Sequence, residues 1–450
     1  MSEEFKVLTL NCWGVFVPSC TVRKNDRLNA IAQHLIGGTY DVVLLQEIWQ
    51  DDDYQKLQDA LSYVYNFSNY FHCHTIGSGM CIFSKWPIEN IMFHPYSVNG
   101  YPQFIHQADW YCGKGVGLAR IITKNGFRIN FYVTHLVARY ELNRKLDRYH
   151  GHRTCQLIDL LQFIRCTSSS SDAIVIAGDF NLEPNTPDIA FFKSYLGVSD
   201  AWMDSLERYS NGPTSSPIPN EKTEIEGCTC DRADNPYRND EWTKHYGNGE
   251  RLDYIFYRTS SGPIDPVSAP ASCRLTCQSS WLDLRKVPHD TDGLHYSDHV
   301  GVGARFTLNR VLHQEMAVRG RKGESEAAKS MEPVLLELAD HINIGLARCR
   351  RERLLLIGIL AIISLLLLLI FVYGPFRHWF LVLFILLLTA ILSPLWFAIL
   401  MSIVVDHTRE RRALTNGGLV IQLILSQIKA MDESPSDPDT KASGDYPMLS

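Results

Sequence analysis

Several polar side chains in this sequence lie at the ends of short apolar runs, where buried strands would begin or end. Asn11 comes directly after VLTL, and Glu47 comes directly after DVVLLQ. Catalytic groups often lie at such positions, because strands support them rigidly. One such residue alone means little, since a polar residue after a strand is usually at the surface. The set as a whole indicates a site: Asn11, Glu47, His135, Asp179, Asn181, Asp253, Asp298 and His299.

These residue types suit the metal-dependent hydrolysis of a phosphodiester. Mg²⁺ prefers hard oxygen ligands and usually keeps several waters. The Glu47 carboxylate and the Asn11 amide oxygen would therefore hold it and leave room for a substrate phosphate. A histidine oriented by a carboxylate can deprotonate water, because its unperturbed pKa is about 6.5. Amide and imidazole donors stabilise charge on phosphoryl oxygens, and the metal neutralises the leaving alkoxide.

The elements that must position these residues are strands mixed with helices. Helical spacing of apolar residues predicts helices at 24–37 and 142–165. Residues 209–249 are rich in Asn, Pro, Gly, Ser and Thr, and predict a long loop or an insertion. The mixture predicts an α/β layered sandwich, with sheets packed together and helices outside. Strands are expected at 5–11, 41–46, 79–84, 116–123, 127–134, 173–178 and 252–257.

The composition of the chain changes after residue 307. Two uncharged apolar runs follow, and at about 1.5 Å per residue each is long enough to cross a hydrocarbon core of about 30 Å. An apolar stripe precedes them at Leu335, Leu338, Ile342 and Leu346, and it could lie along the membrane interface or pack on the domain. We expect a catalytic domain at 1–307, a linker at 308–330, a juxtamembrane helix at 331–353, transmembrane helices at 354–373 and 379–405, and a C-terminal helix with a disordered tail at 406–450.

Arginines flank the two apolar runs on one side, and the turn between the runs holds only Arg377. Positive flanks stay in the cytosol. The pattern predicts a multi-pass membrane protein of the endoplasmic reticulum or the plasma membrane, with both chain ends and the catalytic domain in the cytosol. The flanking arginines could also contact anionic lipids. They are Arg348, Arg350, Arg351 and Arg353 before the first run, and Arg409, Arg411 and Arg412 after the second.

Charge and cysteine content narrow the function classes. The net charge of −6 argues against a nuclease, because proteins that bind phosphate backbones are more often basic, so no nucleic-acid partner is expected. The twelve cysteines are scattered without framework spacing. They are expected to be reduced and mostly buried thiols.

The ordered series LNCWG, QE, THL, GDFN, LDY and SDH resembles the endonuclease/exonuclease/phosphatase superfamily, which has the DNase I-like fold. Within it, four segments are similar to the neutral sphingomyelinases: LNCWG (10–14), IGSGMCIFSK (76–85), NGYP (99–102) and DWYCGKGVG (109–117). The resemblance implies an α/β (α+β) four-layer sandwich followed by a two-helix transmembrane hairpin. It also implies Mg²⁺-dependent hydrolysis of sphingomyelin to ceramide and phosphocholine at the membrane by water attack, with Mn²⁺ as a substitute metal.

The same resemblance assigns a role to each residue of the set. Glu47, Asn11 and Asp298 lie at the metal, and His299 is the general base for water, oriented by Asp253. Which histidine is acid and which is base stays open. The remaining roles are a nucleophile-positioning Asp179, a charge-stabilising Asn181, His135 as donor to the phosphate or the leaving oxygen, and Lys114 as a phosphate contact or a solvated turn residue.

Several other functions remain open at this stage. A phospholipase C acting on lyso-choline lipids (lysophosphatidylcholine, lyso-platelet-activating factor) is a close variant. A membrane-tethered nuclease and an inositol phosphatase of the same superfamily are further alternatives. A catalytically dead membrane scaffold is disfavoured, because the polar set is complete.

Overall fold

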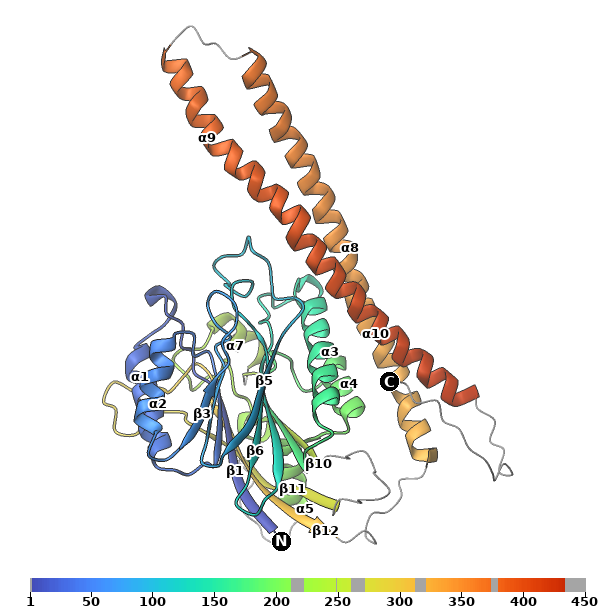
Figure 1. The fold of residues 1–450 in the computed structure, drawn as a ribbon. Helices are drawn as coiled ribbons and strands as arrows, with labels where there is room; N and C mark the ends of the chain where they lie inside the picture. Colours follow the sequence, from blue (N-terminus) through green and yellow to red (C-terminus); the bar gives the residue numbers. More distant parts are fainter. Residues whose placement is uncertain are drawn as a thin grey trace.

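The computed structural model describes residues 2–211, 222–247, 249–259, 272–311, 321–373 and 379–433. Its strands form two six-stranded sheets (Figure 1). The first has the order β11-β12-β1-β2-β4-β3, and its central pair, β1 and β2, is parallel. The bounds of its strands are β1 Ser2–Asn11, β2 Val42–Gln46, β3 Phe67–Tyr70, β4 Cys81–Ser84, β11 Ser272–Asp283 and β12 Gly301–Val311.

The second sheet has the order β5-β6-β7-β8-β10-β9, and its central pair, β7 and β8, is again parallel. The carboxyl ends of both central pairs carry residues of the predicted polar set. The bounds are β5 Ile88–Pro95, β6 Gly115–Ile122, β7 Arg128–His135, β8 Ala173–Asp179, β9 Ser199–Asp200 and β10 Asp253–Thr259.

Helices cover the outer face of each sheet. Alternate strand residues face opposite ways, so Val7 and Val175 pack between the sheets, whereas Leu8 packs against α1 and Ile174 against α3 and α4. The order is therefore helices, sheet, sheet, helices, which confirms the predicted four-layer sandwich. The helices of this domain are α1 Lys24–Ile36, α2 Asp51–Leu61, α3 His150–Thr167, α4 Pro187–Leu196, α5 Ala201–Asn211, α6 Lys222–Glu226 and α7 Asp240–Tyr246.

Three further helical stretches form a long rod beside the sandwich (Figure 1). They are α8 Arg321–Tyr373, α9 Trp379–Met401 and α10 His407–Glu433, and a π-helical segment at Ser402–Asp406 joins the last two. The lower parts of α8 and α10 pack on α3, and α8 also packs on α4. Leu335, Leu338 and Ile342 are almost fully buried there. Of the two placements that the sequence left open for this stripe, the structure has it on the domain.

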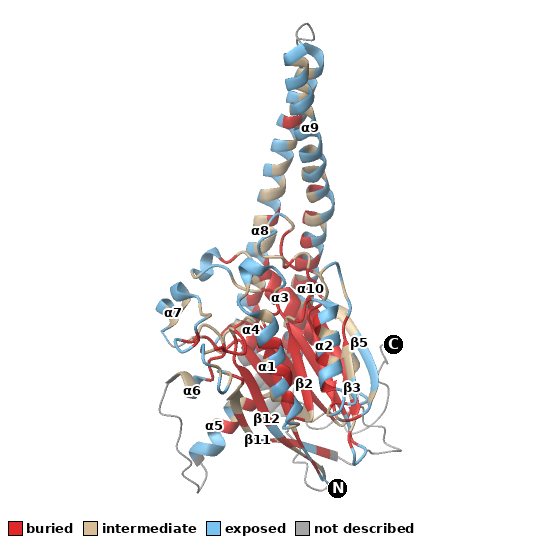
Figure 2. Ribbon diagram, turned by 90° about the vertical axis from the view of Figure 1, so that its left-hand side faces the viewer, coloured by how far each residue is buried: buried red, intermediate tan, exposed pale blue. Residues whose placement is uncertain are grey.

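The upper part of the rod is apolar and exposed. The helices Met331–Tyr373 and Trp379–Ala430 each contain a stretch that is long and apolar enough to cross a membrane. Side chains such as Leu354, Phe371 and Phe384 are more than half exposed, in contrast to the buried sheets (Figure 2). An apolar surface of this kind on a soluble monomer is unusual, and it fits membrane association.

Some element boundaries differ from those expected. Strand β12 continues to Val311, past residue 307, because it stays paired with β11 as far as Ser272. Helix α8 begins at Arg321, inside the expected linker. The helix expected at 142–165 begins at His150.

The expected loop at 209–249 contains α6 and α7. The turn at 374–378 and the tail at 434–450 lie outside the described residues.

Candidate active site

The carboxyl ends of the two central strand pairs bring the predicted residues together. Asn11 ends β1 and Glu47 follows β2, while His135 ends β7 and Asp179 ends β8. Since parallel strands end at the same edge of a sheet, each pair is adjacent within its own sheet. Asp253 joins them from β10, where it is paired directly with Asp179.

Asn11 links the two sheets at this edge. Its side-chain amide nitrogen donates to Glu47 Oε1 at 2.9 Å and to Asp179 Oδ2 at 3.0 Å. Its amide oxygen accepts the backbone N–H of Trp13 at 3.0 Å. In this orientation Asn11 holds the two carboxylates at a fixed separation.

The backbone around Glu47 is held in an unusual conformation. Glu47 has a φ of +62°, in the left-handed region that non-glycine residues seldom adopt. Gly14 donates its N–H to the Glu47 carbonyl oxygen at 3.0 Å, and a Cβ at residue 14 would overlap that oxygen. The glycine of the LNCWG segment is therefore needed so that this loop can approach Glu47. Trp49 Nε1 lies 3.4 Å from Glu47 Oε2 on the other side.

His299 and Asp253 form a buried pair. The His299 Nδ1 atom lies 2.7 Å from Asp253 Oδ2, and His299 Nε2 lies 4.0 Å from Asp179 Oδ2. Burial alone would lower the pKa of His299, but the adjacent Cys230 and Asp253 outweigh it and raise that pKa well above its ordinary value. Asp253 thus fixes which ring nitrogen faces Asp179.

The site carries more negative charge than its own cations neutralise. Burial, with the nearby Asp253, raises the pKa of Asp179 to about 7. Burial and the charge of Glu47 raise the pKa of Asp298 to about 6. The carboxylates of Glu47 and Asp179 accept from the same Asn11 amide, and Asp298 lines the same cleft. These hard oxygen donors fit a divalent cation such as Mg²⁺.

His135 and Asn181 also line the site. His135 Nε2 lies 3.6 Å from Asp179 Oδ2, and burial, with Lys114 and His299, lowers the pKa of His135 well below its ordinary value. A neutral His135 can donate a hydrogen bond, but it has no extra proton to transfer. Asn181, at a φ of +49°, donates its side-chain amide to Leu136 O at 3.0 Å, which aims its side chain across the site.

Lys114 lies in the same cleft, but its charge is already paired. Its ammonium is 2.8 Å from Asp109 Oδ1 and donates to Leu136 O at 3.1 Å, and both ion-pair partners are buried. Asp109 also accepts the Tyr140 hydroxyl at 2.6 Å. The lysine is therefore not a solvated turn residue, and this pairing ties two loops together beneath the site.

Sequence reasoning missed the residues that support the site. Arg27 is completely buried and donates to the carbonyl oxygens of Cys12, Trp13 and Tyr296, which joins the LNCWG loop to the SDH loop. The Ser297 hydroxyl donates to Asn11 O at 2.7 Å. The signal that could have indicated Arg27 is its place next to the apolar positions of the first helix, where a charged side chain is unusual.

The convergent residues line a cleft of about 1040 Å³. Most of the predicted polar set lines it, and so do His341, Ile344 and Arg348 of α8. Exposed apolar side chains such as Phe16 and Ile105 also line the cleft. A cleft lined by both a polar set and apolar groups suits a ligand with a phosphate head and a hydrocarbon body.

Comparisons with known proteins agree with this architecture. Residues 8–299 match the model of the Endonuclease/Exonuclease/phosphatase family. A putative neutral sphingomyelinase of Caenorhabditis elegans is 34% identical over 82% of this chain and 80% of its own length. Sphingomyelin phosphodiesterase 2 of Homo sapiens is 31% identical over 78% and 75%. An inositol phosphosphingolipids phospholipase C of Schizosaccharomyces pombe is 34% identical over 70% and 78%. The chain therefore belongs to the Endonuclease/Exonuclease/phosphatase family, which confirms the resemblance that its motifs carry.

Proposed function

We propose that this chain is a Mg²⁺-dependent neutral sphingomyelinase, which hydrolyses sphingomyelin to ceramide and phosphocholine at a membrane surface. The observation that carries the proposal is the single cleft that joins the polar set to α8, the helix that continues into an apolar span. The match with the relatives named for sphingomyelin hydrolysis spans three quarters or more of the length of those relatives. Sphingomyelin has the phosphate head and apolar body that such a cleft suits.

In this proposal, Glu47 and Asp298 supply carboxylate oxygens to the cation, and Asn11 keeps Glu47 and Asp179 apart by donating to both. When bound, a divalent cation acts as a Lewis acid and stabilises negative charge on the phosphoryl and leaving oxygens. Mn²⁺ also accepts oxygen ligands and would substitute for Mg²⁺.

The protein's own residues prepare the water. Asp253 accepts the proton of His299 Nδ1, so Nε2 is the ring atom that faces Asp179. His299 acts as a base in its neutral form, which the positive charge of a bound cation would favour. His299 then takes the proton of a water that Asp179 positions. Asn181 and the neutral His135 donate hydrogen bonds to the phosphoryl or leaving oxygens. Lys114 is paired with Asp109 and donates to Leu136 O, so it supports the backbone next to His135 and is not a free ammonium for the phosphate.

The membrane setting follows from the two apolar helices and their flanks. We infer that the two spans form a hairpin, with the catalytic domain and both chain ends in the cytosol, in the endoplasmic reticulum or the plasma membrane. Arg350, Arg351 and Arg409 are exposed near the base of the hairpin, where they would contact anionic lipid headgroups.

The test is a substrate panel with the purified full-length chain in mixed micelles and Mg²⁺. The panel contains sphingomyelin, lysophosphatidylcholine, an inositol phosphosphingolipid, a soluble inositol phosphate and DNA. We expect ceramide and phosphocholine as the main products. Faster release of phosphocholine from lysophosphatidylcholine would replace the proposal with the lyso-choline phospholipase, and cleavage of DNA or of the soluble inositol phosphate alone would remove the lipid substrate.

A further inference from the structure

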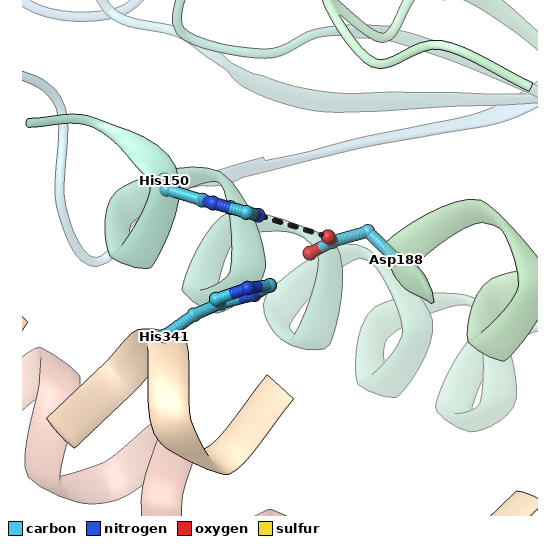
Figure 3. Close-up of side chains that lie close together, drawn as sticks. All are labelled: His150, Asp188 and His341. Carbon is cyan, nitrogen blue, oxygen red and sulfur yellow. Dashed lines mark hydrogen bonds and ion pairs between the residues drawn. The ribbon is translucent and has the colours of Figure 1, made fainter. Parts of the chain in front are cut away.

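A second group of metal-ligating side chains lies outside the catalytic set. His150 is the first residue of α3, Asp188 is in the first turn of α4, and His341 is on α8. Their ligand atoms all lie within 4.8 Å of one another. Figure 3 shows the two imidazole rings side by side, with the Asp188 carboxylate at their edge. Three separate elements thus meet at this point, and one of them is the helix that leads to the membrane.

The separation of the His150 and Asp188 ligand atoms matches that of two ligands on one ion. His150 Nε2 lies 3.3 Å from Asp188 Oδ2, whereas a charge-assisted N–H···O bond is normally about 2.7–2.9 Å. Two ligands bound at about 2.0 Å to one tetrahedral Zn²⁺ are about 3.3 Å apart. The His341 Nδ1 atom is buried and has no hydrogen-bond partner among the described residues. A buried nitrogen without a partner is costly, and an ion at the centre of the group would give it one.

Charge also favours a cation here. The centroids of the two rings are 3.6 Å apart, so two protonated rings would repel each other strongly and at least one ring must offer a lone pair. Asp188 offers a carboxylate oxygen to the group. Two imidazoles and one carboxylate form a donor set that zinc-class ions prefer to Mg²⁺.

The surrounding structure holds the three ligands in place. The Thr154 hydroxyl donates to Asp188 Oδ1 at 2.8 Å, which leaves Oδ2 directed at His150. Such outer partners commonly orient metal ligands. A Cβ at Gly151 would lie 3.2 Å from the His341 carbonyl oxygen, so the glycine lets α8 approach α3 closely. Ile342, one residue further along α8, is 1% exposed in the core, which fixes the rotation of that helix.

We propose that His150, Asp188 and His341 bind a zinc-class divalent ion, which fastens the membrane-proximal helix α8 to the catalytic domain. His150 and His341 both line the cleft, so an ion can enter from there and keep a water in the fourth position. The site is separate from the catalytic set and does not depend on the substrate proposed above.

The test measures metal binding by the full-length chain in detergent, after chelation and exchange into buffer that contains excess Mg²⁺. Co²⁺ is then titrated as a visible-absorption probe for tetrahedral coordination, and bound Zn²⁺ is counted by elemental analysis. We expect the intense Co²⁺ bands of a tetrahedral site and at least one equivalent of Zn²⁺. His341→Gln should remove one equivalent, and the exposed His289→Gln serves as the matched control and should remove none.

Three more variants separate the loss of a ligand from misfolding and from changes at the catalytic set. His150→Gln removes the ligand on the other side of the contact and should lose the same equivalent. Glu47→Gln should retain it, which separates this site from the catalytic cation. Thr154→Val, which removes the outer partner, should weaken Zn²⁺ binding by about 10–100-fold. Equal zinc content in wild type, His341→Gln and His150→Gln, all shown to be folded by circular dichroism, would overturn the proposal.

Discussion

The pairing of His299 with Asp253 gives the sharpest prediction. His299 Nδ1 and Asp253 Oδ2 are 2.7 Å apart. The His299 and Asp253 side chains are only 8% and 0% exposed, so solvent screens their interaction weakly. In Asp253→Asn, the amide nitrogen can donate to Nδ1, which leaves the ring proton on Nε2, where the ring should accept a proton from water. We expect turnover to fall by about 10³–10⁴-fold, which is about 4–5.5 kcal/mol at about 1.36 kcal/mol per tenfold.

His299→Ala should lower turnover by about 10²–10⁴-fold. Because Asp253 acts through His299, the double variant should be no slower than the slower single variant, as expected for residues that act as one unit. The assay is release of phosphocholine from sphingomyelin in mixed micelles at saturating Mg²⁺, with thermal unfolding as a check on the fold.

The chain provides a matched control for this experiment. Asp283 forms a second Asp–His pair with His34, at 3.1 Å, on the side of the first sheet that faces α1. Asp283→Asn should leave turnover unchanged within about twofold. Multiplicative losses in the double variant, or a near-normal rate in Asp253→Asn, would show that Asp253 does not orient the base.

Three further predictions concern the cation, the loop and the lysine. EDTA should abolish hydrolysis and added Mg²⁺ should restore it, as followed by product release. Gly14→Ala should displace the Glu47 backbone and raise the Mg²⁺ concentration needed for half-maximal rate by at least about tenfold. The control is Gly358→Ala, whose added Cβ meets nothing within 4 Å, and it should leave that concentration unchanged. Lys114→Met leaves Asp109 buried and unpaired, and should lower the free energy of unfolding by about 3–5 kcal/mol, of which Lys114→Met combined with Asp109→Asn should recover part.

Each of these has a clear contrary result. Full activity in excess chelator would remove the metal mechanism. Equal Mg²⁺ titrations for Gly14→Ala and wild type would show that the close approach to Glu47 is not needed. A Lys114→Met variant of unchanged stability in denaturant would mean that the ion pair is not the main role of the lysine.

The apolar patterning was sufficient to predict the centre of the fold. Continuous apolar runs identify strands buried on both faces, so β2 and β8 were predicted within a residue or so of their observed bounds. The edge strand β5 was missed, because most of its residues are exposed to solvent and its sequence mixes polar and apolar residues. β11 was missed for a similar reason, since Cys, Ser, Thr and Gln interrupt its apolar positions.

The residues of the candidate site were predicted by type, but the hydrogen bonds among them were not. The sequence indicated that Asn11 and Glu47 belong together, yet not that the Asn11 amide nitrogen faces the carboxylates. Such contacts depend on three-dimensional packing between distant segments. For the same reason, the periodicity of α8 gave its apolar face but not the partner of that face, and His341 carried no signal without the positions of His150 and Asp188.

Because α8 runs without a break from the cleft into the apolar run, it fixes the distance between the cleft and the membrane surface. Arg348 lines the cleft, and Leu354 begins the apolar run six residues later, which is about 9 Å along the helix. The headgroup layer on each side of a bilayer is about 5–8 Å thick. A lipid whose tails remain among its neighbours would therefore bring its phosphate close to the mouth of the cleft. The enzyme would then need to raise its substrate by only a short distance, and a single residue inserted between Arg348 and Leu354 would turn the mouth by about 100° relative to the bilayer.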